Sequence, residues 1–172
     1  STELTVGTIM LIGLAFLFFA GPALAPYPYA RMGVAKPFAP AFEAGHVFGT
    51  DELGRDVFSR VIHGTRFSLQ VAFSAALLAT LAGGLLGMVA GFFRGWIDLT
   101  VMRAADLLLS FPSLLLAIVV VAIMGPGLTN TAIVIGIVYA PRVARIARGA
   151  VMSVKENDYV TAATALGVRR MR

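Results

Sequence analysis

The sequence has no cysteine, only two histidines and few charged residues. The lack of cysteine excludes disulfides and thiolate metal sites, and His46 and His63 are too few and too far apart to predict a metal centre. Charged residues make up 13% of the 172 residues, whereas soluble domains carry about a quarter. Because 58% of the residues are hydrophobic, lipid is the expected solvent of this chain.

The sequence also lacks the signatures of the common hydrolases. No Gly-Lys dipeptide occurs, so there is no phosphate-binding Walker loop, and neither a His-Glu-x-x-His pair nor a Gly-x-Ser-x-Gly elbow is present. We therefore expect a chain that is not an enzyme and binds no cofactor or metal. If ATP drives its function, a partner subunit must hydrolyse it.

Long apolar runs predict an all-α, polytopic bundle of about four membrane spans. The first span is expected in residues 1–25, closed by Pro22 and Pro26; a cleaved signal peptide is the alternative, although no basic residue precedes the run. A polar, proline-rich loop follows at 26–66. The transport domain is expected in 67–172, with further spans near residues 67–93, 105–124 and 128–150.

Glycines recur every four residues within the second expected span, at Gly83, Gly87 and Gly91. This spacing lays a glycine stripe along one face of a helix, which lets helix backbones approach closely. The alternative is that glycine is simply frequent in membrane helices.

The distribution of Lys and Arg predicts the orientation. Nine of the fourteen lie in residues 94–103 and 142–172, and five lie in the loop at 26–66. By the positive-inside rule, the loop should face outward and the final segment should face the cytoplasm. The net charge of +5 is explained in the same way, and we expect no nucleic-acid partner.

Two ionisable residues stand near the inner start of the third span. Arg103 and Asp106 are three residues apart, a spacing suited to an intramembrane ion pair that softens the burial of both. A proton or ion relay through Asp106 is the alternative. Arg142, Arg145 and Arg148 share a helical arc and should reach the headgroups or face protein.

The last segment predicts a short helix outside the bilayer. In residues 157–167, an Asx cap precedes helix-forming residues, and Tyr159, Ala162, Ala163 and Leu166 fall on one face. Small residues on such a face suit docking in a groove, and Gly167 permits a turn. An ordinary amphipathic surface helix would show the same pattern.

These residues resemble the cytoplasmic coupling segment of binding-protein-dependent ABC importer permeases. In that family the segment is a short helix seated in a cleft of the ATPase. Ala162, Ala163 and Gly167 match its motif, whereas Thr161 stands where glutamate is commonest. The resemblance implies a coupling helix at 157–170, in which ATPase coupling falls to Tyr159, Thr161, Ala162, Ala163, Leu166 and Gly167.

Other stretches resemble the dipeptide, oligopeptide and nickel branch of the family, in particular its second permease subunit. They are residues 48–60, 106–112, 125–128 and 155–167, in the expected order. The resemblance implies the type I permease fold of ABC importers and a multi-pass protein of a bacterial or archaeal inner membrane. The family pattern continues beyond Gly167, and the chain begins without Met, so we expect a fragment truncated after the coupling helix.

The resemblance implies an importer permease for peptides or similar small solutes, such as dipeptides, oligopeptides or nickel complexes. Its implied partners are a paired permease subunit, cytoplasmic ATPase subunits, an extracytoplasmic solute-binding protein and the lipid bilayer. The alternative function is an ATP-independent channel or secondary transporter. That class would be expected to carry several ionisable groups at mid-span, and here Asp106 is the only candidate.

Overall fold

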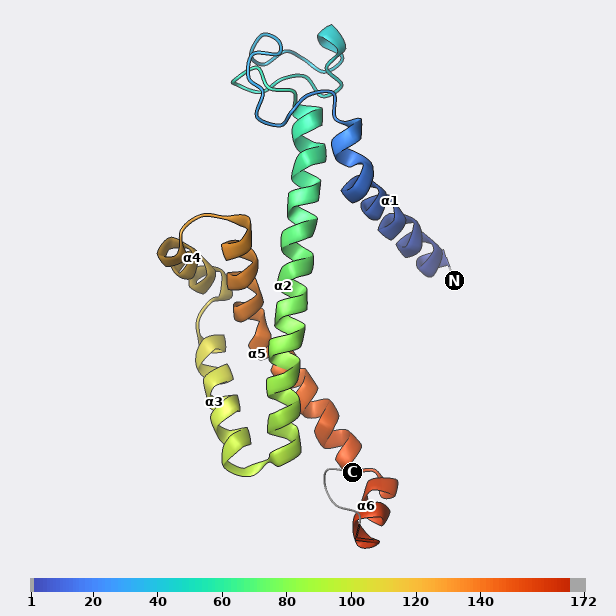
Figure 1. Cartoon of the computed structure of the whole chain (residues 1–172), viewed down its shortest axis with the longest axis vertical. Helices are drawn as coiled ribbons and strands as arrows, with labels where there is room; N and C mark the ends of the chain where they lie inside the picture. Colours follow the sequence, from blue (N-terminus) through green and yellow to red (C-terminus); the bar gives the residue numbers. More distant parts are fainter. Residues whose placement is uncertain (1, 168–172) are drawn as a thin grey trace. The chain divides into compact units, whose positions relative to one another are not determined.

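The computed structural model describes residues 2–167, apart from the side chains of Ala44, Thr161, Ala163 and Thr164. The described part is helical except for its loops and one isolated β-bridge, so the predicted all-α fold is confirmed (Figure 1). The helices are α1 (Thr2–Leu24), α2 (Val57–Phe93), α3 (Gly95–Ser110), α4 (Ser113–Met124), α5 (Leu128–Lys155) and α6 (Asp158–Ala165), with a 3-10 turn η1 (Glu43–Gly45). Two compact units, Ser1–Gln70 and Val71–Arg172, divide within α2.

Fewer helices qualify as membrane spans than the four expected. Among the described residues, α1 and α2 are long and apolar enough to cross a bilayer, and α3 with α4 would make a third if the bent pair forms one broken span. Helix α5 does not qualify because its second half carries Arg142, Arg145 and Arg148, which dilute the apolar run.

The helix expected at residues 105–124 is interrupted. Helix α3 ends at Ser110, α4 begins at Ser113, and the two axes differ by 92°. Pro112 explains the break, because a proline disfavours helical backbone in the residue before it. Phe111 accordingly has an extended backbone, with φ −88° and ψ 141°.

Helix α2 begins ten residues before the expected span at 67–93. Its first turns carry Arg60, His63 and Arg66, which broke the apolar pattern in the sequence. Ile62 nevertheless lies 6% exposed in these turns and packs on α1, where a Cβ built at Gly21 would approach its Cγ2 to 2.9 Å. An amphipathic start to α2 therefore gives the first unit its helix contact.

The loop between α1 and α2 is folded rather than extended. Backbone hydrogen bonds join Gly33 N–H to Leu53 O, Val34 N–H to Gly54 O and Thr50 N–H to Ala39 O. Gly49 has φ +71°, and a Cβ there would lie 2.1 Å from the carbonyl oxygen of Ala39. Only glycine fits this crossing of two loop segments.

A buried polar cluster fastens the loop to the first turn of α2. His46 Nδ1 donates to Asp56 Oδ1 at 2.8 Å, and Asp56 Oδ2 accepts from both the backbone N–H and the hydroxyl of Ser59 at 2.7 Å. The Ser59 hydroxyl oxygen in turn accepts the backbone N–H of Tyr27 at 3.1 Å. The side chains of His46, Asp56 and Ser59, which we call the latch, are all buried, so their hydrogen bonds are shielded from competing water.

Both aspartates of the loop are held as carboxylates. Burial favours a higher pKa for Asp51, but hydrogen bonds from Arg55 and from the Leu53 N–H outweigh it and lower the pKa from 3.8 to about 2. Burial likewise opposes the shift at Asp56, where hydrogen bonds from Ser59 and His46 lower the pKa. Because both folded-state pKa values are depressed, both carboxylates stabilise the loop at neutral pH and cease to do so in acid; for Asp51 the stabilisation is lost as the pH falls from about 4 through about 2.

The latch predicts that Asp56→Asn loosens the loop. The amide replaces one of two acceptor oxygens with a donor, so a buried donor of Ser59 or His46 loses its acceptor, which raises local opening about tenfold. Hydrogen exchange of loop residues 26–56 at neutral pH measures this opening. In the unaltered protein, the protection factors of the same amides, corrected for the pH dependence of the intrinsic exchange rate, should also fall between about pH 4 and 2 as Asp51 is protonated.

Glu52→Gln is the matched control, because Glu52 is an exposed carboxylate in the same loop. It should leave the exchange unchanged. Equal protection in both variants would contradict the structural role of the latch. Protection factors that do not change in acid would contradict stabilisation of the loop by its carboxylates.

Candidate functional site

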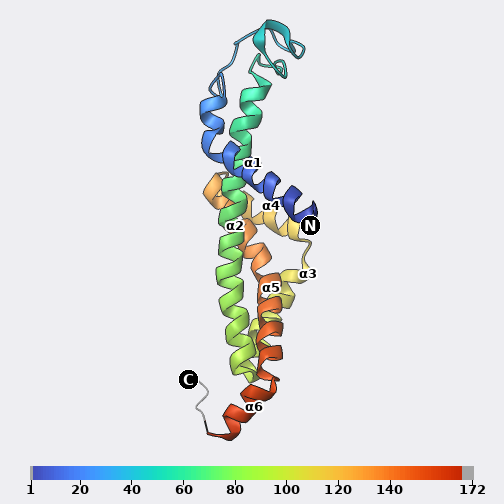
Figure 2. The same cartoon turned by 90° about the vertical axis from the view of Figure 1, so that its right-hand side faces the viewer.

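The glycine stripe of α2 lies against α5. A Cβ built at Gly83 would lie 2.2 Å from the carbonyl oxygen of Ala140, and one at Gly87 would lie 2.1 Å from that of Ala144. At Gly91 the nearest atoms are Arg148 O and Val151 Cβ, both at 3.0 Å. Figure 2 shows α5 running beside the C-terminal half of α2. All three glycines predicted for helix packing therefore face α5 at positions where an added Cβ would come within 3.0 Å of its backbone.

We call the contact between the glycine stripe of α2 and α5 the seam. A reciprocal contact extends the seam toward the start of α5. Gly136 of α5 faces Leu78 of α2, whose Cδ2 would lie 2.3 Å from a Cβ at Gly136. The sequence analysis missed Gly136 because it is a lone glycine without a repeat. Ala75 and Ala79 of α2 are also buried, so small residues line α2 beyond the glycine stripe.

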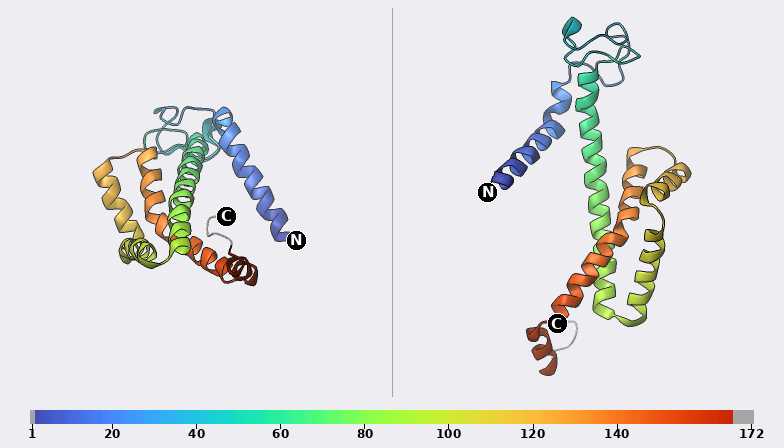
Figure 3. Two further views of the ribbon diagram at one scale, coloured as in Figure 1. Left: turned by 60° about the horizontal axis from the view of Figure 1, so that its bottom comes forward. Right: turned by 180° about the vertical axis from the view of Figure 1, so that it is seen from behind.

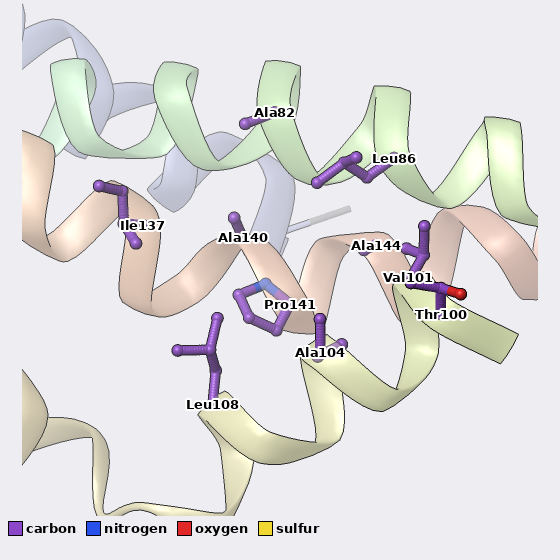
Figure 4. Close-up of a pocket in the computed structure, with 11 residues that line it drawn as sticks. Ala82, Leu86, Thr100, Val101, Ala104, Leu108, Ile137, Ala140, Pro141 and Ala144 are labelled. Carbon is purple, nitrogen blue, oxygen red and sulfur yellow. The ribbon is translucent and has the colours of Figure 1, made fainter. Parts of the chain in front are cut away.

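The small residues leave an apolar cavity of about 370 Å³ between α2, α3 and α5 (Figure 4). Its lining includes Ala82 and Leu86 of α2, Ala104 of α3, and Ala140 and Pro141 of α5. Thr100 supplies the one side-chain hydroxyl in the lining. None of the described residues that line this space is charged, so they offer no chemistry for acid or base catalysis.

Helix α5 runs from Leu128 to Lys155 with Pro141 inside it. The proline has no N–H, so the carbonyl of Ile137 loses its helical partner. Pro141 is buried among small residues of the seam and cavity, which support the helix on either side of it.

Asp106 has a different partner from the one expected. Within the described residues its ion pair is with Arg145 of α5, at 2.7 Å, and not with Arg103 of its own helix. The three-residue spacing put Arg103 close along α3, but the packing of α5 on α3 brings a second arginine to Asp106. Both members of the pair are more than half exposed, so it contributes little stability.

Two further cations of α5 hold neighbouring elements. Arg148 forms a two-pronged pair with Asp98 in the first turn of α3, Nε to Oδ1 at 2.5 Å and Nη2 to Oδ2 at 2.6 Å. Lys155 donates to the backbone carbonyl of Phe92 at 2.7 Å, at the C-terminus of α2. The arginine arc was visible in the sequence, whereas its partners depend on tertiary packing.

Helix α6 follows α5 after a two-residue break and continues away from α3 and α4 (Figure 3). The side chains of Tyr159 and Leu166 are 65% and 85% exposed, and Ala162 between them is also exposed. Gly167 ends the segment with φ +81°, a left-handed conformation that suits glycine. The backbones of Thr161 and Ala163 lie in α6, and positions 168–170 of the expected coupling helix lie outside the described residues.

The geometry defines a class before any comparison with known proteins. Apolar helices long enough to span a bilayer and helix packing through small residues characterise a polytopic membrane protein, and α6 adds a short helix with exposed apolar side chains. The catalytic arrangements that would define an enzyme are not found at this seam or cavity.

The family described as "binding-protein-dependent transport system inner membrane component" matches residues 83–172. The chain belongs to this family, as its coupling-segment resemblance predicted, and is an inner-membrane component. The match runs from the first glycine of the α2 stripe through the whole of α5 and α6.

Curated relatives extend the similarity over nearly the whole chain. A dipeptide transport system permease protein of Alkalihalophilus pseudofirmus is 40% identical over 97% of this chain and 55% of its own length. A di/tripeptide permease of Pseudomonas aeruginosa is 40% identical over 96% and 56%. A glutathione permease of Pectobacterium atrosepticum is 37% identical over 94% and 53%. The chain thus spans about half the length of these relatives.

The seam predicts that Gly87→Leu destabilises the full-length protein. A branched side chain would meet the backbone of Ala144, which cannot move as a flexible side chain would, so α2 and α5 must separate. The expected cost is about 2 kcal/mol or more of unfolding free energy, seen as a lower melting temperature in detergent.

Gly84→Leu is the matched control on the same helix, because nothing lies within 4 Å of a Cβ at Gly84. It should preserve or slightly raise the melting temperature, since leucine is the better helix former. Equal melting temperatures for the two variants would mean that the seam does not hold α2 to α5.

Proposed function

We propose that the full-length protein is the permease subunit of an ATP-driven importer and that a separate cytoplasmic ATPase powers it through α6. The observation that carries the proposal is the exposed face of α6, where Tyr159 and Leu166 find no cover within the described part of the chain. Exposed apolar side chains grouped on a short helix are typical of a helix that docks in a partner's groove.

The orientation follows from charge. Nine of the fourteen Lys and Arg lie from Arg94 onward, so this part of the chain faces the cytoplasm, where an ATPase would meet α6. The loop at 26–66 then faces outward, and we propose that a solute-binding protein delivers substrate on that side. The family description, which specifies dependence on a binding protein, supports this partner.

The transport pathway would form between this subunit and a paired permease. The exposed apolar surfaces of α3 and α4, which include Leu107, Leu114 and Ile123, are suited to lipid or to a second permease. In this arrangement the protein moves solute and the ATPase performs the hydrolysis.

Small peptides are the proposed substrates. The relatives with about 40% identity are named for dipeptide and di/tripeptide transport, and a further relative is named for glutathione, itself a peptide. The described lining of the apolar cavity beside α3 does not offer the charged groups that a peptide's termini would need.

The docking role predicts that changes on the exposed face of α6 uncouple the importer. Ala162→Trp and Leu166→Asp should weaken co-purification of the full-length permease with its ATPase and lower peptide uptake about tenfold or more. The physical reason is added bulk in a close-fitting groove at one position and a buried, unpaired charge at the other.

Ala165→Trp serves as the control, because residue 165 lies about 100° from Leu166 and about 120° from Tyr159 on a helical wheel. It should bind the ATPase and transport normally. Normal ATPase binding and uptake in all three variants would refute the docking role of α6.

A further inference from the structure

The C-terminal half of α5 is tied to two other helices at the end of the bundle nearest α6. Arg148 holds Asp98 in α3, and Lys155 holds the last carbonyls of α2, at 2.7 Å from Phe92 O and 3.5 Å from Gly91 O. Lys155 is the last residue of α5, and α6 begins at Asp158. Only two residues therefore separate the Lys155 contact from the helix proposed to dock on the ATPase.

The Arg148–Asp98 pair has the geometry of a clamp. Its two parallel N–H···O bonds fix the guanidinium and carboxylate planes together, which a single contact would not do. The side chains are 30% and 17% exposed, so water competes weakly with the pair. The Arg145–Asp106 pair joins the same two helices but has one bond and is more than half exposed on both sides.

The Lys155 contact complements the clamp. The last carbonyls of a helix lack intrahelical partners and carry partial negative charge, so an ammonium group there satisfies and neutralises them. The Lys155 Nζ also lies 5.2 Å from the centre of the Phe92 ring, within range of a cation–π contact. Helix α5 is thereby joined to the end of α2 at the point where α2 turns into α3.

We propose that Asp98, Arg148 and Lys155 are positioning residues that lock the ends of α2, α3 and α5 into one body, so that a displacement of α6 moves all three helices together. This inference rests on the proposed function and adds to it the residues that carry movement from α6 into the bundle. Without the clamp, α6 and the end of α5 would shift while α3 stayed behind, and ATP would be hydrolysed with little transport.

Import per ATP hydrolysed in the full-length permease, reconstituted with its paired permease, ATPase and binding protein, tests the inference. Asp98→Ala should lower this ratio roughly fivefold or more. Asp106→Ala, the same change in the same helix at the exposed pair, should leave it unchanged. Arg148→Lys keeps the charge but loses the second prong, so its ratio should fall between the two.

A merely structural role would give a different result. Asp98→Ala would then lower the melting temperature or the yield of assembled complex, while import per ATP in the assembled complex stayed normal. That outcome would overturn the inference and leave the proposed function intact. A wild-type complex that imports no peptide with ATP would instead overturn the proposed function, and the inference with it.

A measurement without the ATPase tests the clamp itself. The 172 residues contain no cysteine, and Leu99 and Ser153 are exposed. Spin labels can therefore be attached at Leu99→Cys and Ser153→Cys in the full-length permease. Electron paramagnetic resonance then records the distribution of distances between the two labels. Asp98→Ala should broaden the distribution, and Asp106→Ala should not. An unchanged width in Asp98→Ala would show that the pair does not hold α3 to α5 and would refute the inference.

Discussion

The contact between α2 and α5 is the constraint on which the rest of the second unit depends. Lipid chains are as apolar as leucine, so burial of apolar surface cannot by itself draw two membrane helices together. Close backbone packing can, and here the glycines at 83 and 87 bring α2 within van der Waals reach of the carbonyls of Ala140 and Ala144. Any side chain on α2 at these points would have to push α5 away.

The contacts at the end of the second unit nearest α6 follow from this packing. With α5 held against α2, its basic half reaches α3 and the end of α2, where Asp98 and the carbonyl of Phe92 receive Arg148 and Lys155. The small residues that permit the contact also leave the apolar cavity beside α3. Helix α6 follows directly and contacts α5, and its apolar side chains remain exposed. Packing by small residues and ion pairing thus follow one another along α5, which leads directly to α6.

The sequence predicted the features that depend on local spacing. A four-residue glycine repeat places residues on one helix face whatever the fold, and the face of Tyr159 and Leu166 follows from the same periodicity. The partner of Asp106 and the His46–Asp56–Ser59 latch could not be predicted, because they join residues that only the tertiary fold brings together. The 92° bend between α3 and α4 was likewise beyond the sequence, which located Pro112 within the apolar run but not the angle between the two helices.

The central claim, that α6 seats on an ATPase, is tested most directly by photo-crosslinking. A photoreactive phenylalanine analogue would replace Leu166 in the full-length permease, where the 85% exposed side chain should meet the partner, and Ala165 in a separate variant. Illumination in cells, followed by mass spectrometry, identifies whatever lies against each position. The account predicts an adduct with the ATPase from position 166 and little from position 165. Adducts with lipid alone from position 166, in cells where the transporter is active, would contradict it.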